Sequence, residues 1–195
     1  MTFSALLLAG GESRRMGRDK ATLEIAGQPL WKRQLELLRA LAPENIFISA
    51  RTTPPWLPRN TELLLDDPPS RGPISGIRKA LAAMSTTHLM VLAVDMPFMT
   101  AGELRLLLEM TTEIRGVVPI IGERAEPLAA IYPAEAAIEF QSALTGPDFS
   151  LQRIVRELAT AELMTFCAVP EQRANLYRSV NEPSDFKEGR FETAL

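Results

Sequence analysis

The sequence has few of the side chains that carry covalent or redox chemistry. Its 195 residues include one cysteine, Cys167, and one histidine, His88. A lone cysteine cannot form an internal disulfide, and the apolar neighbours of Cys167 in residues 164–169 indicate a buried core thiol in a reducing compartment. His88 begins an apolar run and is interpreted as a structural residue. Neither residue is therefore a candidate nucleophile.

Long apolar runs and an excess of positive charge are also absent. No apolar run approaches the ~18 residues that a membrane helix needs, and Arg14, the first basic residue, follows the first apolar stretch instead of preceding it as in a signal peptide. The 21 Lys and Arg residues and 24 Asp and Glu residues give a net charge of −3, which would not gather nucleic acid or anionic lipid. We expect a cytoplasmic protein with no membrane or nucleic-acid partner.

Short apolar runs alternate with amphipathic patterns along the chain, which predicts an α/β fold. The runs expected to form strands are 3–8, 45–50, 61–65, 89–94, 117–121 and 128–132. Three helices are expected between them, with apolar faces formed by Trp31, Leu35, Leu38 and Ala42, by Ile74, Ile77, Leu81 and Met84, and by Leu104, Leu107 and Leu108. This order indicates a mainly parallel central sheet covered on both faces, in a single domain of residues 1–195.

The loop after the first expected strand combines glycines with basic residues. Gly10 and Gly11 let backbone N–H groups approach phosphate oxygens, which Arg15 and Lys20 can neutralise. A Walker loop is excluded because Gly17 is not followed by Lys, and no dinucleotide fingerprint is present. The loop is interpreted as a triphosphate cradle, and the alternative is a tight turn with a solvated basic surface.

Two polar residues stand at other points where such folds bind ligands. Asp95 directly follows the apolar run 89–94, and ligands of open α/β sheets lie beyond the carboxyl ends of the strands. A carboxylate there suits Mg²⁺, which prefers one or two carboxylates plus substrate phosphates. A loop-capping aspartate is the alternative. Asn181, two residues before Pro183, predicts only a helix cap by itself.

Taken together, these blocks resemble the molybdenum cofactor guanylyltransferases, small relatives of the sugar-phosphate nucleotidylyltransferases. The resemblance runs from end to end and rests on Leu8-Ala9-Gly10-Gly11, Arg15-Met16-Gly17, Asp19-Lys20, Gly72-Pro73-Ile74-Ser75-Gly76, Asp95-Met96-Pro97, Glu126-Pro127-Leu128 and Val180-Asn181-Glu182-Pro183. It implies a three-layer Rossmann-like nucleotidyltransferase fold. It also implies Mg²⁺-dependent transfer of GMP from GTP to the terminal phosphate of molybdopterin, with pyrophosphate as the other product.

The resemblance assigns roles to particular residues. Lys20 would bind the phosphates with support from Arg15, and Asp95 would carry Mg²⁺. Asp67 would help to read guanine, with Asp66 as a close rival. The base and ribose would be held by the segment Leu8, Ala9, Gly10 and Gly11.

Two further positions complete the expected site. Ser49 stands where the family often places an asparagine that contacts the nucleotide, so a hydroxyl keeps one contact at most. Asn181 would lie near the metal and the acceptor phosphate. Proteins that deliver the cofactor, or apo-molybdoenzymes that receive it, are candidate partners.

Two other functions stay open at this point. A cytidylyl or sugar-phosphate nucleotidylyltransferase would use the same loop, lysine and aspartate, and base preference would separate it from a guanylyltransferase. A non-catalytic nucleotide-binding module that delivers the cofactor would bind the nucleotide without releasing pyrophosphate.

Overall fold

The protein is built around one mixed β-sheet. The computed structural model describes residues 1–10, 19–67, 70–146 and 148–180. In this part of the chain eight strands form the sheet in the order β10-β7-β9-β6-β1-β4-β5, with β8 paired to β7. The strands are β1 (Phe3–Leu8), β4 (Ile46–Ala50), β5 (Glu62–Leu65), β6 (His88–Ala93), β7 (Gly116–Ile121), β8 (Arg124–Ala125), β9 (Ala129–Pro133) and β10 (Met164–Ala168).

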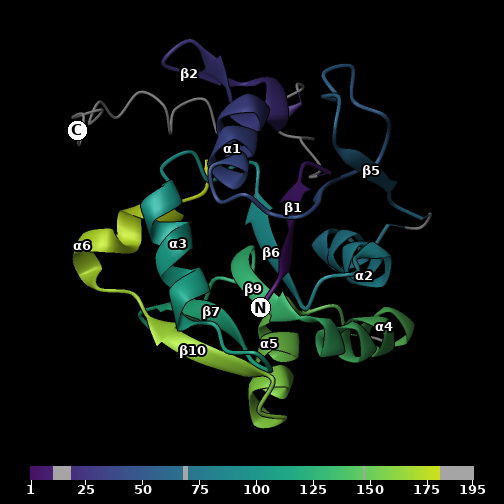
Figure 1. Ribbon diagram of the computed structural model, residues 1–195, viewed down its shortest axis with the longest axis vertical. Coiled ribbons are helices and arrows are strands. Elements are labelled where there is room, and N and C mark those ends of the chain that lie inside the picture. The colour runs from purple at the N-terminus through teal and green to yellow at the C-terminus, as the bar shows by residue number, and fades with distance from the viewer. Residues whose placement is uncertain (11–18, 68–69, 147, 181–195) are drawn as a thin grey trace.

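Most neighbouring strands are parallel, as the alternation of strands and helices predicts. β1 pairs in parallel with β4 and with β6, β4 with β5, and β7 with β10. Among the described strands of this sheet, only β9, between β6 and β7, and the short β8 run antiparallel to their partners. The carboxyl ends of β1, β4, β5 and β6 therefore meet at one edge of the sheet (Figure 1).

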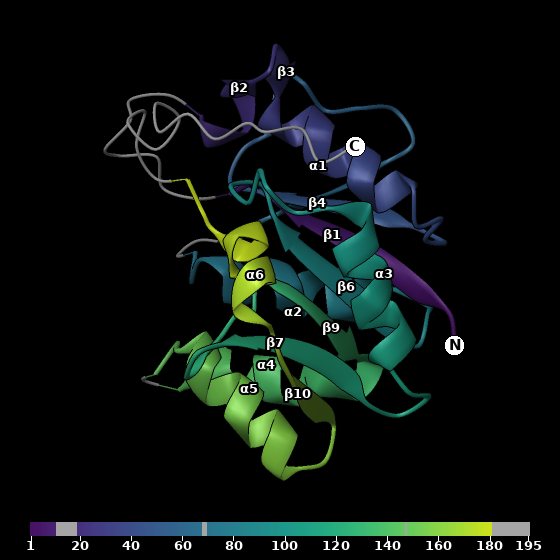
Figure 2. The same ribbon diagram turned by 90° about the vertical axis from the view of Figure 1, so that its left-hand side faces the viewer.

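Helices cover both faces of the sheet and give the expected three layers. One face carries α2 (Pro73–Ala83), α4 (Ala137–Thr145) and α5 (Leu151–Thr160), and the other carries α1 (Leu30–Arg39), α3 (Ala101–Met110) and α6 (Glu171–Ala174) (Figures 1 and 2). Side chains of a strand alternate between its faces. Accordingly, Leu6 and Leu8 of β1 pack in the core beneath α2, while Ala5 and Leu7 pack in the core beneath α1 and α3.

Local signals explain where the main helices begin and end. The Oγ1 of Thr100 accepts the Glu103 N–H at the start of α3, and Pro73 occupies the first turn of α2, where a missing N–H costs nothing. The apolar repeat predicts that the helix from Pro29 reaches Ala42, but α1 ends at Arg39. Ala42 has a positive φ of 53°, which is incompatible with a continuing helix.

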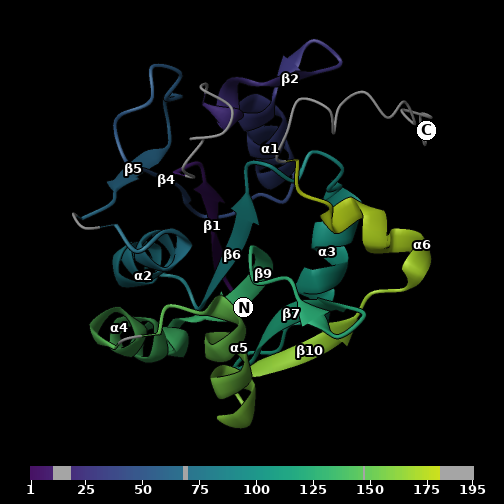
Figure 3. The same ribbon diagram turned by 180° about the vertical axis from the view of Figure 1, so that it is seen from behind.

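Short elements and one burial prediction differ from the sequence-based expectation. The hairpin of β2 (Glu24–Ile25) and β3 (Gln28–Pro29) lies beside α1 (Figure 3) and was not predicted. The prediction of a core thiol is wrong: Cys167 is only partly buried, because β10 is the last strand of the sheet. Burial still raises the pKa of its thiol, which disfavours a nucleophilic thiolate.

None of the helices in the described ranges is long and apolar enough to cross a membrane.

Candidate active site

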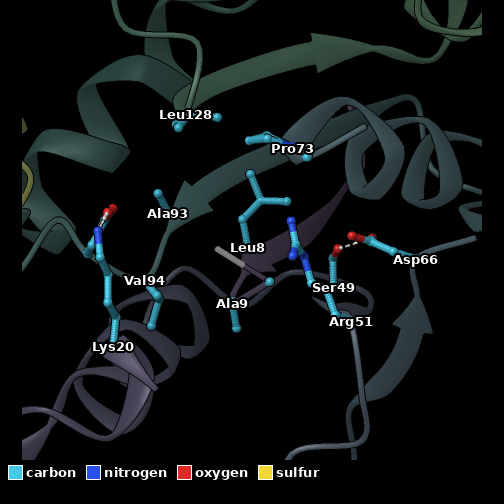
Figure 4. A pocket seen from close by; sticks show the side chains of 13 residues that line it. Leu8, Ala9, Lys20, Ser49, Arg51, Asp66, Pro73, Ala93, Val94 and Leu128 are labelled. Carbon is cyan, nitrogen blue, oxygen red and sulfur yellow. Dashed lines mark hydrogen bonds and ion pairs between the residues drawn. The ribbon is translucent and has the colours of Figure 1, made fainter. Parts of the chain in front are cut away.

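A pocket of about 350 Å³ opens at the carboxyl edge of the sheet, over the ends of β1, β4 and β6. This is the edge at which open α/β sheets bind their ligands. Figure 4 shows that its polar side chains gather at two ends, with Lys20 at one and Ser49 and Asp66 at the other. The lining residues are Leu8, Ala9, Gly10, Lys20, Ser49, Arg51, Asp66, Gly72, Pro73, Ala93, Val94, Asp95 and Leu128.

The first end of the pocket is an ion pair. The Nζ of Lys20 lies 3.1 Å from Oδ2 of Asp95, and the two side chains are 17% and 21% exposed. Lys20 begins the short helix η1 (Lys20–Thr22), which is capped when Oδ1 of Asp19 accepts the Ala21 N–H at 2.9 Å. The other carboxylate oxygen of Asp19 accepts the indole N–H of Trp56 at 3.2 Å. These contacts fix the backbone from which Lys20 reaches across to Asp95.

Helix α1 holds the loop that carries Asp95. The amide nitrogen of Gln34 donates to the Met96 carbonyl, and Nε of Arg33 donates to the Pro97 carbonyl at 2.8 Å. Gln34 is fully buried, so its hydrogen bond is made without competition from water. Because Met96 and Pro97 directly follow Asp95, these bonds orient the carboxylate towards the pocket and not towards the core.

A second set of contacts reaches the same loop from the C-terminal part of the chain. Glu103 of α3 is buried and accepts the Tyr177 hydroxyl at 2.7 Å and Nη1 of Arg173 at 2.9 Å. Three residues after Tyr177, the Val180 N–H donates to the carbonyl of Asp95 at 2.8 Å. We call this set (Glu103, Arg173, Tyr177 and Val180) the C-terminal latch. Val180, the last described residue, therefore lies directly beside Asp95.

The second end of the pocket is centred on Asp66, which follows β5. Its Oδ1 accepts the Ser49 hydroxyl at 3.3 Å and its Oδ2 accepts the Ser70 hydroxyl at 2.7 Å. Each carboxylate oxygen has further lone pairs, so Asp66 can accept two more hydrogen bonds from a ligand. Ser49, on β4, is nearly fully buried and therefore orients Asp66 as well as lining the pocket.

Asp67 occupies a different environment from its neighbour. Successive side chains of an extended segment point to opposite sides, and the Asp67 carboxylate turns to α2, 2.7 Å from Nζ of Lys79 and 3.4 Å from Nη2 of Arg78. The hydrogen bond from Lys79 lowers the pKa of Asp67. Its side chain is 70% exposed, and it is not among the residues that line the pocket.

The pocket brings together most of the residues that the sequence singles out. Leu8, Ala9, Gly10, Lys20, Ser49 and Asp95 line one cavity, whereas Gly11, Arg15 and Asn181 lie outside the described residues. Arg51, one residue after β4, also lines the pocket, and it is not among the site residues predicted from the sequence. Its only signal is this position at a strand end. Among the described residues, no group of three or more His, Cys, Asp or Glu side chains is placed to hold a metal ion.

The fold and this pocket define a nucleotidyltransferase. The family model described as "MobA-like NTP transferase domain" matches residues 5–163, and the chain belongs to this family. It is 37% identical over 182 residues to a probable molybdenum cofactor guanylyltransferase of Opitutus terrae, covering 92% of this chain and 90% of the relative. It is 35% identical to the molybdenum cofactor guanylyltransferase of Pseudomonas fluorescens, covering 80% of each chain. Family membership is consistent with a requirement for a divalent metal ion.

Solved structures support the fold. The molybdopterin-guanine dinucleotide biosynthesis protein A of Archaeoglobus fulgidus superposes with a TM-score of 0.67 at 24% identity, over 94% of this chain and 95% of that one. A 4-diphosphocytidyl-2C-methyl-D-erythritol synthase of Anaerococcus prevotii has a TM-score of 0.72 at 8% identity, over 95% and 93%. At such identities the likeness establishes the shared architecture and leaves the choice of substrate to the residues of the pocket.

Proposed function

We propose that this protein transfers GMP from GTP to the terminal phosphate of molybdopterin. The observation that carries the proposal is the layout of the pocket, in which a lysine and an aspartate stand at one end and a hydrogen-bond acceptor, the carboxyl group of Asp66, stands at the other. A nucleoside triphosphate needs this separation of a charged end from a base-reading end. The named activity of relatives that match along most of the chain supports the choice of substrates.

Asp66 is the better candidate for reading the base than Asp67. The guanine edge offers a ring N–H and an exocyclic amine, and a carboxylate can accept both. Asp66 faces the pocket, and Ser49 and Ser70 fix its orientation. Asp67 is engaged with Lys79 and Arg78 on the surface of α2. We therefore assign the base contact to Asp66, with Ser49 as a positioning residue.

The other end of the pocket would bind the triphosphate. The Lys20 ammonium would neutralise the phosphates, and the backbone of residues 8–10, which lines the same pocket, would contact the ribose. Arg15 and Gly11 retain the roles that the family resemblance gives them, support for the phosphates and contact with the nucleotide.

The donor chemistry of this end fits Mg²⁺. Asp95 offers hard carboxylate oxygens, and Mg²⁺ is commonly held by one or two carboxylates together with substrate phosphates. Asp95 would hold the ion, with Asn181 nearby as the family resemblance implies. When bound, Mg²⁺ neutralises charge on the phosphates and helps to orient them.

The reaction needs positioning and charge stabilisation, and no covalent enzyme intermediate. An oxygen of the acceptor phosphate attacks the α-phosphorus of GTP, a new P–O bond forms, and the bond to the β-phosphate breaks as pyrophosphate leaves with the electron pair. Lys20 stabilises negative charge on the transferred and leaving groups. The only cysteine and histidine lie elsewhere: Cys167 is on β10 and His88 is buried at the start of β6.

Partner proteins and cellular location remain predictions from the sequence. We propose that cofactor-delivery proteins or apo-molybdoenzymes exchange cofactor with this enzyme, and that it works in the cytoplasm. Retention of product on one of these proteins in a pull-down would support the first point.

The test is pyrophosphate release from GTP and Mg²⁺ with molybdopterin, with CTP and a sugar phosphate in parallel reactions. We expect release only with GTP and molybdopterin. Asp66→Asn should reduce the preference for GTP over CTP by about 10- to 100-fold, as expected for hydrogen bonds to a charged group. Asp67→Asn is the matched control and should leave the preference unchanged. Nucleotide binding without any pyrophosphate release would refute the proposal and favour the delivery module.

A further inference from the structure

A second cavity, of about 250 Å³, lies beside the nucleotide pocket. Three segments line it: Arg71, Pro73 and Ile74 at the start of α2, residues 124–128 from β8 towards β9, and residues 149–152 at the start of α5. Pro73 and Leu128 line both cavities, and Figure 4 shows them at one margin of the nucleotide pocket. A ligand in the second cavity could therefore extend directly to the nucleotide.

The side chains of this cavity combine positive charge with a flat surface. The guanidinium of Arg71 stacks on the ring of Phe149, 4.2 Å from its centroid, which fixes both planar groups. Arg124 contributes a second guanidinium. Ile74 and Leu128 supply apolar surface at the cavity wall. A planar, polar ring system can stack on such groups, because guanidinium and phenyl faces both accept a flat partner.

One acidic side chain, Glu126, also lines the cavity. Its Oε1 accepts the Leu128 N–H at 3.3 Å, which ties the carboxylate to the boundary between the two cavities. Glu126 is partly buried, and burial raises the pKa of its carboxyl, with a smaller contribution from the negative charge of Asp95.

These features match the chemistry of a pterin. The pyrimidinone ring of a pterin carries a ring N–H next to an exocyclic amine, the same donor pair that guanine presents, and a carboxylate can accept both. The second cavity is smaller than the nucleotide pocket, so it suits the ring system while the phosphate of the same molecule crosses the boundary at Pro73 and Leu128.

We propose that the second cavity is the acceptor subsite, which binds the pterin ring of molybdopterin. Glu126 accepts hydrogen bonds from the aminopyrimidinone edge of the ring, and the stacked Arg71 and Phe149 side chains contact its face. This inference rests on the proposed function for the identity of the acceptor. It assigns specificity for the acceptor to residues separate from those that read the nucleotide. When the pterin ring occupies the second cavity, the phosphate of the same molecule lies in the nucleotide pocket, which Asp95 and Lys20 also line.

The test uses the full chain with four single substitutions. Arg71→Ala and Glu126→Gln alter the cavity, while Arg156→Ala, at an exposed arginine of α5, and Glu123→Gln, at an exposed glutamate before β8, are matched controls outside it. Pyrophosphate release is measured with molybdopterin varied at saturating GTP, and with GTP varied at saturating molybdopterin. Binding of free pterin (2-amino-4-oxopteridine) is followed separately by the quenching of its fluorescence.

We expect both cavity substitutions to raise the KM for molybdopterin about tenfold or more, to change the KM for GTP less than twofold, and to weaken pterin binding in parallel. The control variants should match the wild type in all three measurements. An unchanged KM for molybdopterin would overturn the proposal, as would an equal rise in the KM for GTP. Tighter binding of molybdopterin by Glu126→Gln would also overturn it, because it would place the phosphate and not the ring in the cavity.

The two proposals fail separately. If the wild type releases no pyrophosphate with any acceptor, the proposed function fails. The pterin titration still tests whether the second cavity binds pterin. The cavity would then be supported as a pterin site if the wild type quenches the fluorescence of free pterin and the Glu126→Gln and Arg71→Ala variants do not. Absence of quenching by the wild type would overturn the subsite even if GMP transfer occurs.

Discussion

Replacing Gly76 by alanine tests how the floor of the nucleotide pocket is built. Gly76 lies in α2 and faces the sheet, where a Cβ atom would stand 2.3 Å from Oγ of Ser49, 2.8 Å from Cβ of Ser49 and 2.9 Å from Cδ2 of Leu8. Real Cβ contacts essentially never fall below 3.0 Å. Ser49 and Leu8 lie on hydrogen-bonded neighbouring strands and line the pocket, so α2 or the pocket floor must move.

Two opposing effects set the size of the change. Overpacking of a filled core costs about 1–3 kcal/mol, while replacing glycine by alanine in a helix recovers about 1 kcal/mol of helix propensity. We expect Gly76→Ala to lower the free energy of unfolding by up to about 2 kcal/mol, a fall in Tm of up to about 8 °C for a chain of this size. Displacement of Ser49 and Leu8 should also weaken GTP binding by about tenfold, which corresponds to about 1.4 kcal/mol.

Urea denaturation and GTP titration by calorimetry measure the two effects. Gly102→Ala in α3 is the matched control, because the nearest atom to its Cβ would be Oγ1 of Thr100, at 3.9 Å. This substitution should be neutral or stabilising by up to about 1 kcal/mol. Adding Ser49→Ala to Gly76→Ala removes the shortest contact and should restore part of the stability. The reasoning is refuted if Gly76→Ala is as stable as the wild type and binds GTP with unchanged affinity.

Three further predictions concern other parts of the molecule. Lys20→Met should lower kcat for pyrophosphate release about 10²- to 10³-fold at saturating GTP, and a change only in KM would contradict its role in charge stabilisation. Burial lowers the pKa of His88 below 6.5. Below about pH 6.5 the unfolded chain binds a proton at His88 more readily than the folded chain, so the free energy of unfolding should fall as the pH drops through this value. Denaturation curves of His88→Gln should lack this loss. A variant whose stability depends on pH in the same way as the wild type's does would refute the prediction. Tyr177→Phe leaves the buried carboxylate of Glu103 without one partner and should cost about 1–3 kcal/mol in urea denaturation; an unchanged stability would show that the latch is dispensable for folding.

Much of the architecture could be predicted because each main strand is a continuous apolar run. The first strand, at residues 3–8, was predicted at its observed bounds, and Asp95 lies just past β6 as expected. Convergence of Lys20 and Asp95 follows from the geometry of parallel strands, which brings carboxyl ends to one edge. Two-residue strands such as β8 have too short a pattern to be detected.

Other features depend on contacts between distant residues and leave no local signal. The choice between Asp66 and Asp67 depends on a shift of one residue at a strand end, which reverses the direction of both side chains. The hydrogen bond between Glu103 and Tyr177 joins residues 74 positions apart. Glu126 is part of a motif in the sequence, but its place in a second cavity requires the packing of α2 and α5 on either side.

The C-terminal latch has a practical consequence for handling the enzyme. Val180 is bonded to the Asp95 carbonyl, so a fluorophore, a surface linker or a fusion partner attached soon after this residue would begin at the rim of the reaction site. Met1 precedes β1 at the opposite, amino edge of the sheet and is half exposed. Attachment before Met1 leaves the rim open to both substrates, and it is the position from which the enzyme can be tethered without obstructing its own turnover.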